Sequence, residues 1–319
     1  MLRQRIFACA LALVVPSVAS FALTEDFSSD PFVNWSFGIG GADPGTNRFD
    51  WNAGAAPTYV GDPTGELNLH LNSSLPTVRL DRPLGVTVTD TDSFSLTTRF
   101  SYSLTSAPGD QFMQISFGLV NSTLTGGDRT GSLLNFGSDN VFHTLEFNYF
   151  PNVSTFFVTG PTLTPTVFGA QKGSGDAFAN FATSFYGDSD LGDNTVGITE
   201  LPQNQTLEAG LAYNGATKVL TLSLSRVEAD GSTTLLVTEV PPVDLVAAGY
   251  DTNFPFVVNS LAIMAYQDGF TSSGDPSLVA DLTFQKFDFA VVPEPTTSLL
   301  VLGSLGLLIC GRRFRQKLS

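Results

Sequence analysis

The sequence predicts an all-β protein in which two antiparallel sheets pack as a β-sandwich. Its 319 residues include 30 Gly, 18 Pro and 27 Phe, a composition that favours strands and turns over helices. Apolar and polar residues alternate in many short segments, and clusters of Gly, Pro, Asn or Asp separate these segments. Outside the two ends of the chain, no segment keeps helical periodicity for more than about two turns.

The clearest strand covers residues 66–72, where three leucines alternate with polar side chains. Alternation of this kind puts the leucines on one face of the strand and the polar residues on the other. At least nine such segments within one body indicate two packed sheets. The other eight predicted strands are residues 93–102, 111–120, 142–150, 207–213, 219–226, 233–240, 260–267 and 278–290.

Two short links predict hairpins. Asn214-Gly215 and Asp230-Gly231 each stand between alternating segments, and Asn-Gly and Asp-Gly are the strongest short-range hairpin signals. The stretch 47–63, rich in Gly, Asn and Pro, is interpreted as a loop.

The N-terminal segment is typical of a secretory signal peptide. Arg3 and Arg5 precede the apolar run 6–15, and small residues follow as far as Ala22. We therefore predict a signal peptide over residues 1–22, with cleavage after Ala22.

The C-terminal segment combines three ordered elements: Pro293-Glu294-Pro295, the apolar stretch 299–310 and a basic tail containing Arg312, Arg313 and Arg315. Together they resemble the PEP-CTERM sorting signal of Gram-negative bacteria that make exopolysaccharide. The resemblance implies a transmembrane helix in the inner membrane, processing by an exosortase, and delivery to the cell surface or extracellular matrix. An ordinary C-terminal membrane anchor, without cleavage, is the alternative. The sequence therefore predicts three parts: a signal peptide over residues 1–22, a β-sandwich domain over residues 23–291 and a sorting signal over residues 292–319.

Several segments of the body resemble concanavalin A-like or laminin-G-like jelly rolls. They are Glu25-Asp26-Phe27, Asn34-Trp35-Ser36, residues 93–100, residues 117–121, residues 211–215 and the closing run 284–289. The resemblance implies a jelly-roll sandwich, a fold that carries lectins, glycosidases, lyases and structural modules, so it selects no single activity.

Charge and cysteine content exclude several classes of function. The formal net charge is −15, with 30 acidic and 15 basic residues, which disfavours nucleic-acid binding. Six of the basic residues belong to the terminal segments, and every acidic residue except Glu294 lies between those segments, so the body is more acidic than the whole chain. Cys9 and Cys310 also lie in the ends, which leaves the body without thiol catalysis or cysteine metal ligands.

Carbohydrate binding has two sets of candidate residues. Aromatic rings stack on the apolar faces of sugars, and the candidates for this role are Trp35, Trp51 and Tyr59. The alternative for these rings is a place in the core, since buried Trp is equally common in sandwiches and exposure decides between the two. Glu66, Asn68 and His70 share one face of the strand 66–72 and would offer polar contacts. The alternative for this polar face is an ordinary solvated outer surface.

Calcium is the candidate cofactor. Asp188, Asp190, Asp193 and Asn194 place four oxygen-bearing side chains in one Gly-rich loop, and Ca²⁺ prefers oxygen ligands from such loops. The spacing differs from that of an EF-hand, and a solvated loop is the alternative.

The sequence shows no residue pattern that is typical of a catalytic site. It has two histidines, no Gly-x-Ser-x-Gly elbow and no pair of closely spaced glutamates in the body. We therefore expect an exported, non-enzymatic structural or adhesive protein, with exopolysaccharide as the candidate partner. A secreted glycoside hydrolase or polysaccharide lyase of the same fold is the alternative.

Overall fold

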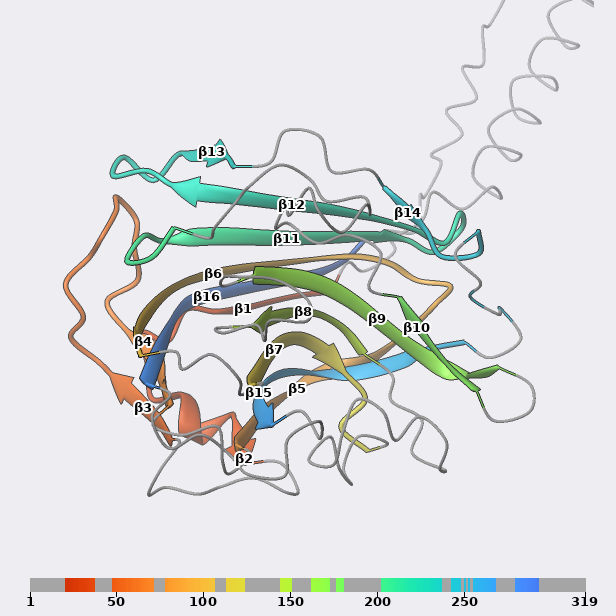
Figure 1. The fold of residues 1–319 in the computed structure, drawn as a ribbon, viewed down its shortest axis with the longest axis horizontal. Coiled ribbons are helices and arrows are strands. Elements are labelled where there is room, and N and C mark those ends of the chain that lie inside the picture. The colour runs from red at the N-terminus through yellow and green to blue at the C-terminus, as the bar shows by residue number, and fades with distance from the viewer. Residues whose placement is uncertain are drawn as a thin grey trace, which may run out of the picture. The chain divides into compact units, whose positions relative to one another are not determined.

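A computed structural model describes most of the region between residues 21 and 292 (Figure 1). Residues Phe21–Val292 form one compact unit, against the predicted 23–291. The described residues are 21–37, 48–71, 78–106, 113–123, 144–150, 162–172, 176–180, 202–236, 242–247, 250, 252, 255–267 and 279–292.

The unit consists of two β-sheets, here called sheet A and sheet B. Sheet A has nine strands, seven of them in the order β13 (Thr233–Leu235), β12 (Val219–Val227), β11 (Leu207–Asn214), β6 (Ser93–Ser106), β16 (Val279–Val292), β4 (Glu66–Leu71) and β3 (Arg48–Asn52). In addition, β1 (Ala22–Glu25) pairs with β16, and β14 (Val243–Asp244) pairs with β12.

Sheet B has seven strands, and one short 3₁₀ helix, η1 (Pro31–Val33), precedes its edge strand β2. Every strand pair in the described part of the chain is antiparallel, so the predicted all-β, two-sheet antiparallel fold is confirmed. The order in sheet B is β10 (Asp176–Asn180), β9 (Thr162–Lys172), β8 (Thr144–Phe150), β7 (Met113–Val120), β15 (Val257–Gln267), β5 (Val78–Thr89) and β2 (Ser36–Phe37).

The core lies between the inner faces of the two sheets and is rich in phenylalanine. Phe100 of β6 packs against Phe117 of β7 with ring centroids 4.9 Å apart, and Phe117 also meets Phe284 of β16 at 5.5 Å. These three rings are buried and come from both sheets, so they join the two layers. Large aromatic rings bury much apolar surface, and this unit has no disulfide to supplement its core.

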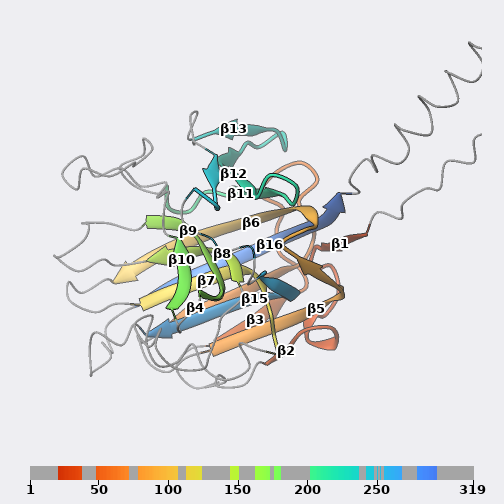
Figure 2. The same ribbon diagram turned by 90° about the vertical axis from the view of Figure 1, so that its right-hand side faces the viewer.

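Strand β16 is an interior strand of sheet A, between β6 on one side and β4 and β1 on the other. It pairs with β6 along its length, with β4 at its first half and with β1 at its second half. Ala22 lies opposite Ala290, so the two ends of the compact unit lie next to each other, and Figure 2 shows β1 beside the end of β16.

All nine predicted strand segments contain a strand, and both hairpin turns lie where the sequence places them. Asn214 accepts hydrogen bonds at its Oδ1 from the backbone N–H groups of Ala216 and Thr217, which stabilises the turn between β11 and β12. Gly231 adopts φ +83° in the turn between β12 and β13.

Two local expectations differ from the structure. The stretch 47–63 is not all loop, because β3 occupies Arg48–Asn52 and pairs with β4. Strand β5 was not predicted, because Pro83 and Gly85 interrupt its alternating pattern.

Both terminal segments fall largely outside the described residues. This applies to the sorting motif Pro293-Glu294-Pro295, to the tail with Arg312, Arg313 and Arg315, and to residues 1–20 of the predicted signal peptide. Of the described residues, none belongs to a helix long and apolar enough to cross a membrane.

Candidate functional site

The polar residues of β4 share the outer face of sheet A, as predicted. The three leucines of this strand are buried, whereas Glu66, Asn68 and His70 are partly exposed. The His70 ring lies between two carboxylates on neighbouring strands. Its Nδ1 is 2.5 Å from Oδ1 of Asp281, and its Nε2 is 3.3 Å from Oδ2 of Asp50. The imidazole therefore links β3, β4 and β16.

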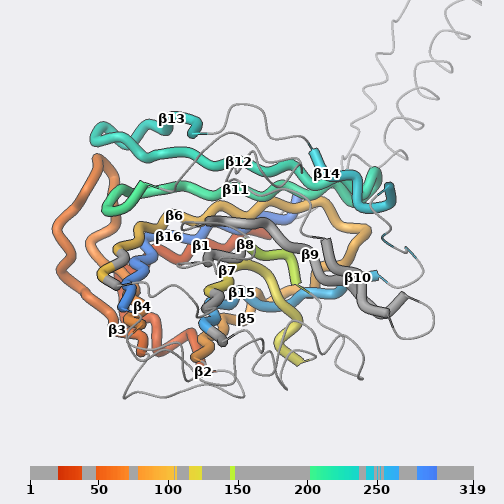
Figure 3. The backbone as a smooth tube through the Cα atoms, viewed as in Figure 1, coloured from red at the N-terminus to blue at the C-terminus, as the bar shows by residue number. Residues whose placement is uncertain are grey.

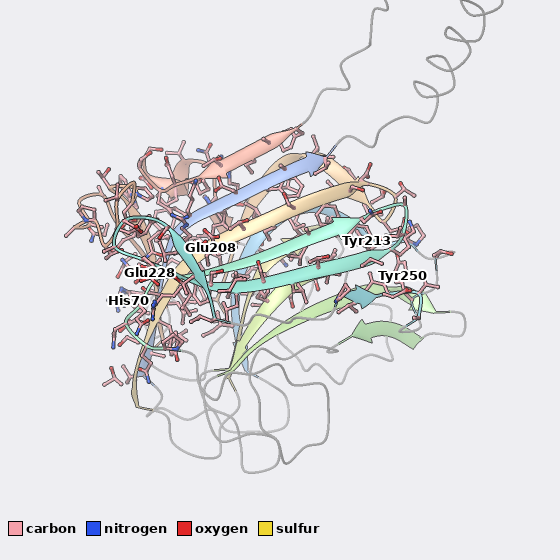
Figure 4. All side chains as sticks on the ribbon, turned by 90° about the horizontal axis from the view of Figure 1, so that it is seen from above. His70, Glu208, Tyr213, Glu228 and Tyr250 are labelled. Carbon is pink, nitrogen blue, oxygen red and sulfur yellow. The ribbon has the colours of Figure 1, made fainter. Side chains whose placement is uncertain are left out.

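Glu66 and Asn68 also contact neighbouring side chains. Oε1 of Glu66 accepts hydrogen bonds from Asn52 at 3.1 Å and from Asn68 at 3.3 Å, and Thr283 donates to Oδ1 of Asn68 at 2.6 Å. Figure 4 shows His70 at the same end of sheet A as Glu208 and Glu228. The outer face is thus a hydrogen-bonded network across three strands, and its polar groups are engaged with one another.

Trp35 lies in the core. Its side chain is only 3% exposed, and its indole Nε1 donates to Oε2 of Glu25 at 3.0 Å. Arg82 forms an ion pair with the same carboxylate oxygen. Of the two readings of Trp35, a sugar platform or a core residue, the structure has the core residue, because this buried carboxylate satisfies the polar edge of the indole and lets the ring enter the core.

Tyr59 is also buried, with 5% of its surface exposed. The guanidinium carbon of Arg99 lies over its ring, 4.9 Å from the centroid. Trp51, on β3, is partly buried, packs against the core, and donates from Nε1 to the backbone oxygen of Phe27 at 2.9 Å. Trp35 and Tyr59 therefore present no open ring face on which a sugar could stack, and Trp51 is half-covered.

Two phenylalanines outside the predicted candidates form an exposed aromatic pair. Phe32 of η1 and Phe37 of β2 are 38% and 50% exposed, and their rings stack at 6.1 Å with an interplanar angle of 17°.

A pocket opens where β5 departs from its regular pairing with β15. The register shifts between Val258 and Ser260, and Gly85 adopts φ +80°. The pocket has a volume of about 250 Å³. Its walls come from three places in the chain: β5 (Pro83, Gly85, Val86, Thr87), the turn after β7 (Ser122) and β15 (Asn259, Ser260).

Asn259 is at the centre of the polar wall of this pocket. Its Oδ1 accepts from the backbone N–H of Ser122 at 2.9 Å and from the Ser122 hydroxyl at 3.0 Å. The Ser260 hydroxyl lies 3.1 Å from both the Ser122 Oγ and the Asn259 Oδ1. These bonds fix the orientation of the amide, and no described residue accepts a hydrogen bond from its Nδ2. The pocket thus combines the two Nδ2 N–H donors of Asn259, the hydroxyl of the exposed Thr87 and the apolar surface of the exposed Pro83.

The outer face of sheet B carries buried acids. Asp81 and Arg79 form a two-contact ion pair, Nε to Oδ1 and Nη2 to Oδ2, each at 2.7 Å. Burial raises the pKa of Asp81, and the contact with Arg79 opposes that rise. Glu146 is fully buried in the same cross-strand row, separated from Asp81 by Gly118 and Ala262. Three strand spacings put the two backbones about 14 Å apart.

Metal ligation has no candidate among the residues that the structure describes, which contain no group of three His, Cys, Asp or Glu suited to an ion. The predicted calcium ligands Asp188, Asp190, Asp193 and Asn194 lie outside the described ranges.

In comparisons with known proteins, this chain resembles others in structure but not in sequence. The chain matches no protein-family model and no curated protein sequence. It is similar to lectin II from Ulex europaeus, with TM-score 0.45 and 13% identity over 85% of this chain and 98% of that chain. It is also similar to a legume lectin-like domain from Entamoeba histolytica, with TM-score 0.42 and 11% identity over 85% and 97%. A carbohydrate esterase from the Shiga toxin-encoding bacteriophage phi24B matches with TM-score 0.37 and 11% identity over 85% and 98%.

Proposed function

We propose that this chain is an exported β-sandwich protein of the cell surface or extracellular matrix that binds carbohydrate without transforming it. The pocket beside Asn259 carries the proposal. Sugar recognition needs oriented hydrogen-bond donors and acceptors next to apolar surface, and this pocket provides an oriented amide, hydroxyl groups and a prolyl ring.

The arrangement of acids supports binding over hydrolysis. A glycosidase places two carboxylates about 5–10 Å apart across a cleft. No carboxylate lines the described pocket. Both Asp81 oxygens contact Arg79, and Oε1 of Glu66 accepts from two asparagines. These two carboxylates are held by neighbouring side chains rather than directed at a substrate.

The terminal segments support export to the surface. The signal-peptide pattern of residues 1–22 and the PEP-CTERM-like segment 292–319 would deliver the sandwich through an exosortase. Mass spectrometry of the mature protein tests this step. A C-terminus near Pro293-Glu294-Pro295 is expected, and an intact tail through Lys317 on extracellular material would contradict it.

One experiment separates binding from catalysis. The protein is screened on a glycan array, and a reducing-sugar assay is run on every polysaccharide that it binds. Binding without release of reducing ends is the expected result. Release would establish the polysaccharide-degrading alternative, and the absence of both would leave a structural role.

A further inference from the structure

We propose that the pocket beside Asn259 takes one uncharged sugar unit of a neutral polysaccharide and that the Asn259 amide orients this unit. The inference rests on the proposed carbohydrate binding and adds the chemical class of the ligand and the residue that selects it.

The size of the pocket limits the ligand to a small unit. Its volume of about 250 Å³ lies below the range of about 300–1,000 Å³ that is typical of sites for drug-sized ligands. A single sugar ring matches this size, whereas a longer segment of polysaccharide would extend over the surrounding surface.

The chemistry of the walls selects an uncharged ligand. None of the seven lining residues is titratable. The Nδ2 of Asn259 offers two N–H donors, and the Thr87 side chain is exposed at the rim with its hydroxyl. Sugar hydroxyls both accept and donate, so they match this set, while the exposed Pro83 provides apolar contact for the C–H face of the ring. A carboxylate or sulfate group would meet no opposite charge here.

The rest of the described surface provides no unpaired cation that could bind an acidic group of a polysaccharide. Every arginine and lysine whose side chain the structure describes is already paired with a carboxylate. An anionic polymer would have to break one of these pairs and approach a chain whose formal net charge is −15. The paired cations are Arg48, Arg79, Arg82, Arg99, Lys218, Arg226 and Lys286.

The amide of Asn259 is held in the orientation that binding requires. Because its Oδ1 accepts from the Ser122 N–H, which can only donate, the amide cannot turn over without losing that bond. An oriented donor needs no rearrangement when the ligand arrives, and a site built to hydrogen-bond a hydroxyl discriminates strongly against ligands that lack it.

The test measures binding of the full chain, in mild detergent, to neutral polysaccharides (dextran, galactan) and acidic ones (alginate, hyaluronan). Each is measured at low and high salt and with EDTA. We expect binding to a neutral polymer that salt leaves unchanged. Asn259→Ala should weaken it by at least tenfold, and Thr87→Trp, which fills the rim without removing an observed hydrogen bond, should abolish it. Thr221→Trp, at an exposed threonine on β12 of the other sheet, is the matched control.

Each outcome decides a different point. Binding of acidic polymers that equals or exceeds binding of neutral ones overturns the ligand class but leaves the proposed function intact. Neutral binding that survives both pocket variants, with unchanged thermal unfolding, overturns the pocket as the site. Absence of binding to any polysaccharide overturns the proposed function itself, and this inference with it.

Discussion

Arg99 covers the ring of Tyr59, and this contact attaches a surface loop to sheet A. The guanidinium carbon is 4.9 Å from the ring centroid, while Nε donates to Oε2 of Glu208 at 2.7 Å. The same loop, residues 53–65, is held by a hydrogen bond from the Val60 N–H to the Ala229 carbonyl at 3.0 Å. Figure 3 shows this segment running from β3 to the end of the β12–β13 hairpin.

The Tyr59 ring, rather than its hydroxyl, should carry the stability of this attachment. The hydroxyl is buried beside Arg99 and Asp62, without a hydrogen bond of good geometry to either. Tyr59→Phe keeps the ring under Arg99 and should change the free energy of unfolding by no more than about 0.5 kcal/mol. Tyr59→Ala leaves a cavity and should cost about 3–4 kcal/mol. Urea unfolding of the two variants measures the difference, and equal losses would refute this interpretation.

The stability of the fold should depend on the backbone conformation of Gly85, a residue that lines the pocket. This residue adopts φ +80°, and an added Cβ would meet no atom within 4 Å. Gly85→Ala therefore tests backbone strain alone and should destabilise the fold by about 1 kcal/mol, or about 2–4 °C in Tm. Gly54→Ala is the matched control, since it also has open space but no left-handed φ. An equal shift in the two variants would contradict the strain argument.

The hydrogen bonds of Ser28 to Asp26 should make part of the stability depend on pH. The Ser28 hydroxyl and backbone N–H donate to Oδ1 of Asp26 at 2.7 and 3.0 Å, and they lower its pKa from the ordinary 3.8. A lowered carboxyl pKa contributes stability above the unfolded value, and this contribution is lost as pH falls through the folded value. Ser28→Ala should cost about 0.5 kcal/mol at pH 7.

Unfolding curves of wild type and Ser28→Ala at neutral and strongly acidic pH measure the difference in their free energies of unfolding. The difference between the two proteins should disappear in acid, where Asp26 is protonated in both states. A difference that persists unchanged in acid would assign the effect of the substitution to something other than this carboxylate.

Calcium binding by residues 188–194 stays a prediction. If Asp188, Asp190, Asp193 and Asn194 hold Ca²⁺, adding the ion should raise Tm by several degrees relative to EDTA, because a ligand that binds only the folded state stabilises it. Asp190→Asn should reduce this rise. The same Tm in calcium and in EDTA would exclude the site.

The predictable parts of this protein are those with clean local patterns. The leucines of β4 identify their strand and its buried face without reference to any other segment. The burial of Trp35 and Tyr59 could not be predicted in the same way, because it depends on Glu25 and Arg99, which reach the two rings from other elements of the fold. Aromatic residues with a polar edge fit either a core or a surface, and only the tertiary partner decides between them.

The pocket could not be predicted from the sequence, for a related reason. Its walls come from residues 83–87, 122 and 259–260, which the antiparallel pairing of β15 with β5 and β7 brings together. The alternation in β4 predicts that Glu66, Asn68 and His70 share one face of sheet A. It does not predict their hydrogen bonds, because these bonds join the three residues to β3 and β16.

The interior place of β16 has a consequence for biosynthesis. Among the described strands it is the last to be synthesised, yet β6, β4 and β1 all pair with it. While the polypeptide emerges from the ribosome or from a translocation channel, sheet A lacks the strand that joins β6 to β4 and β1, and the edges of these neighbours stay open to other chains. Closure of the sheet must wait for residue 292, so a nascent chain needs protection from aggregation until almost the whole sandwich has been made.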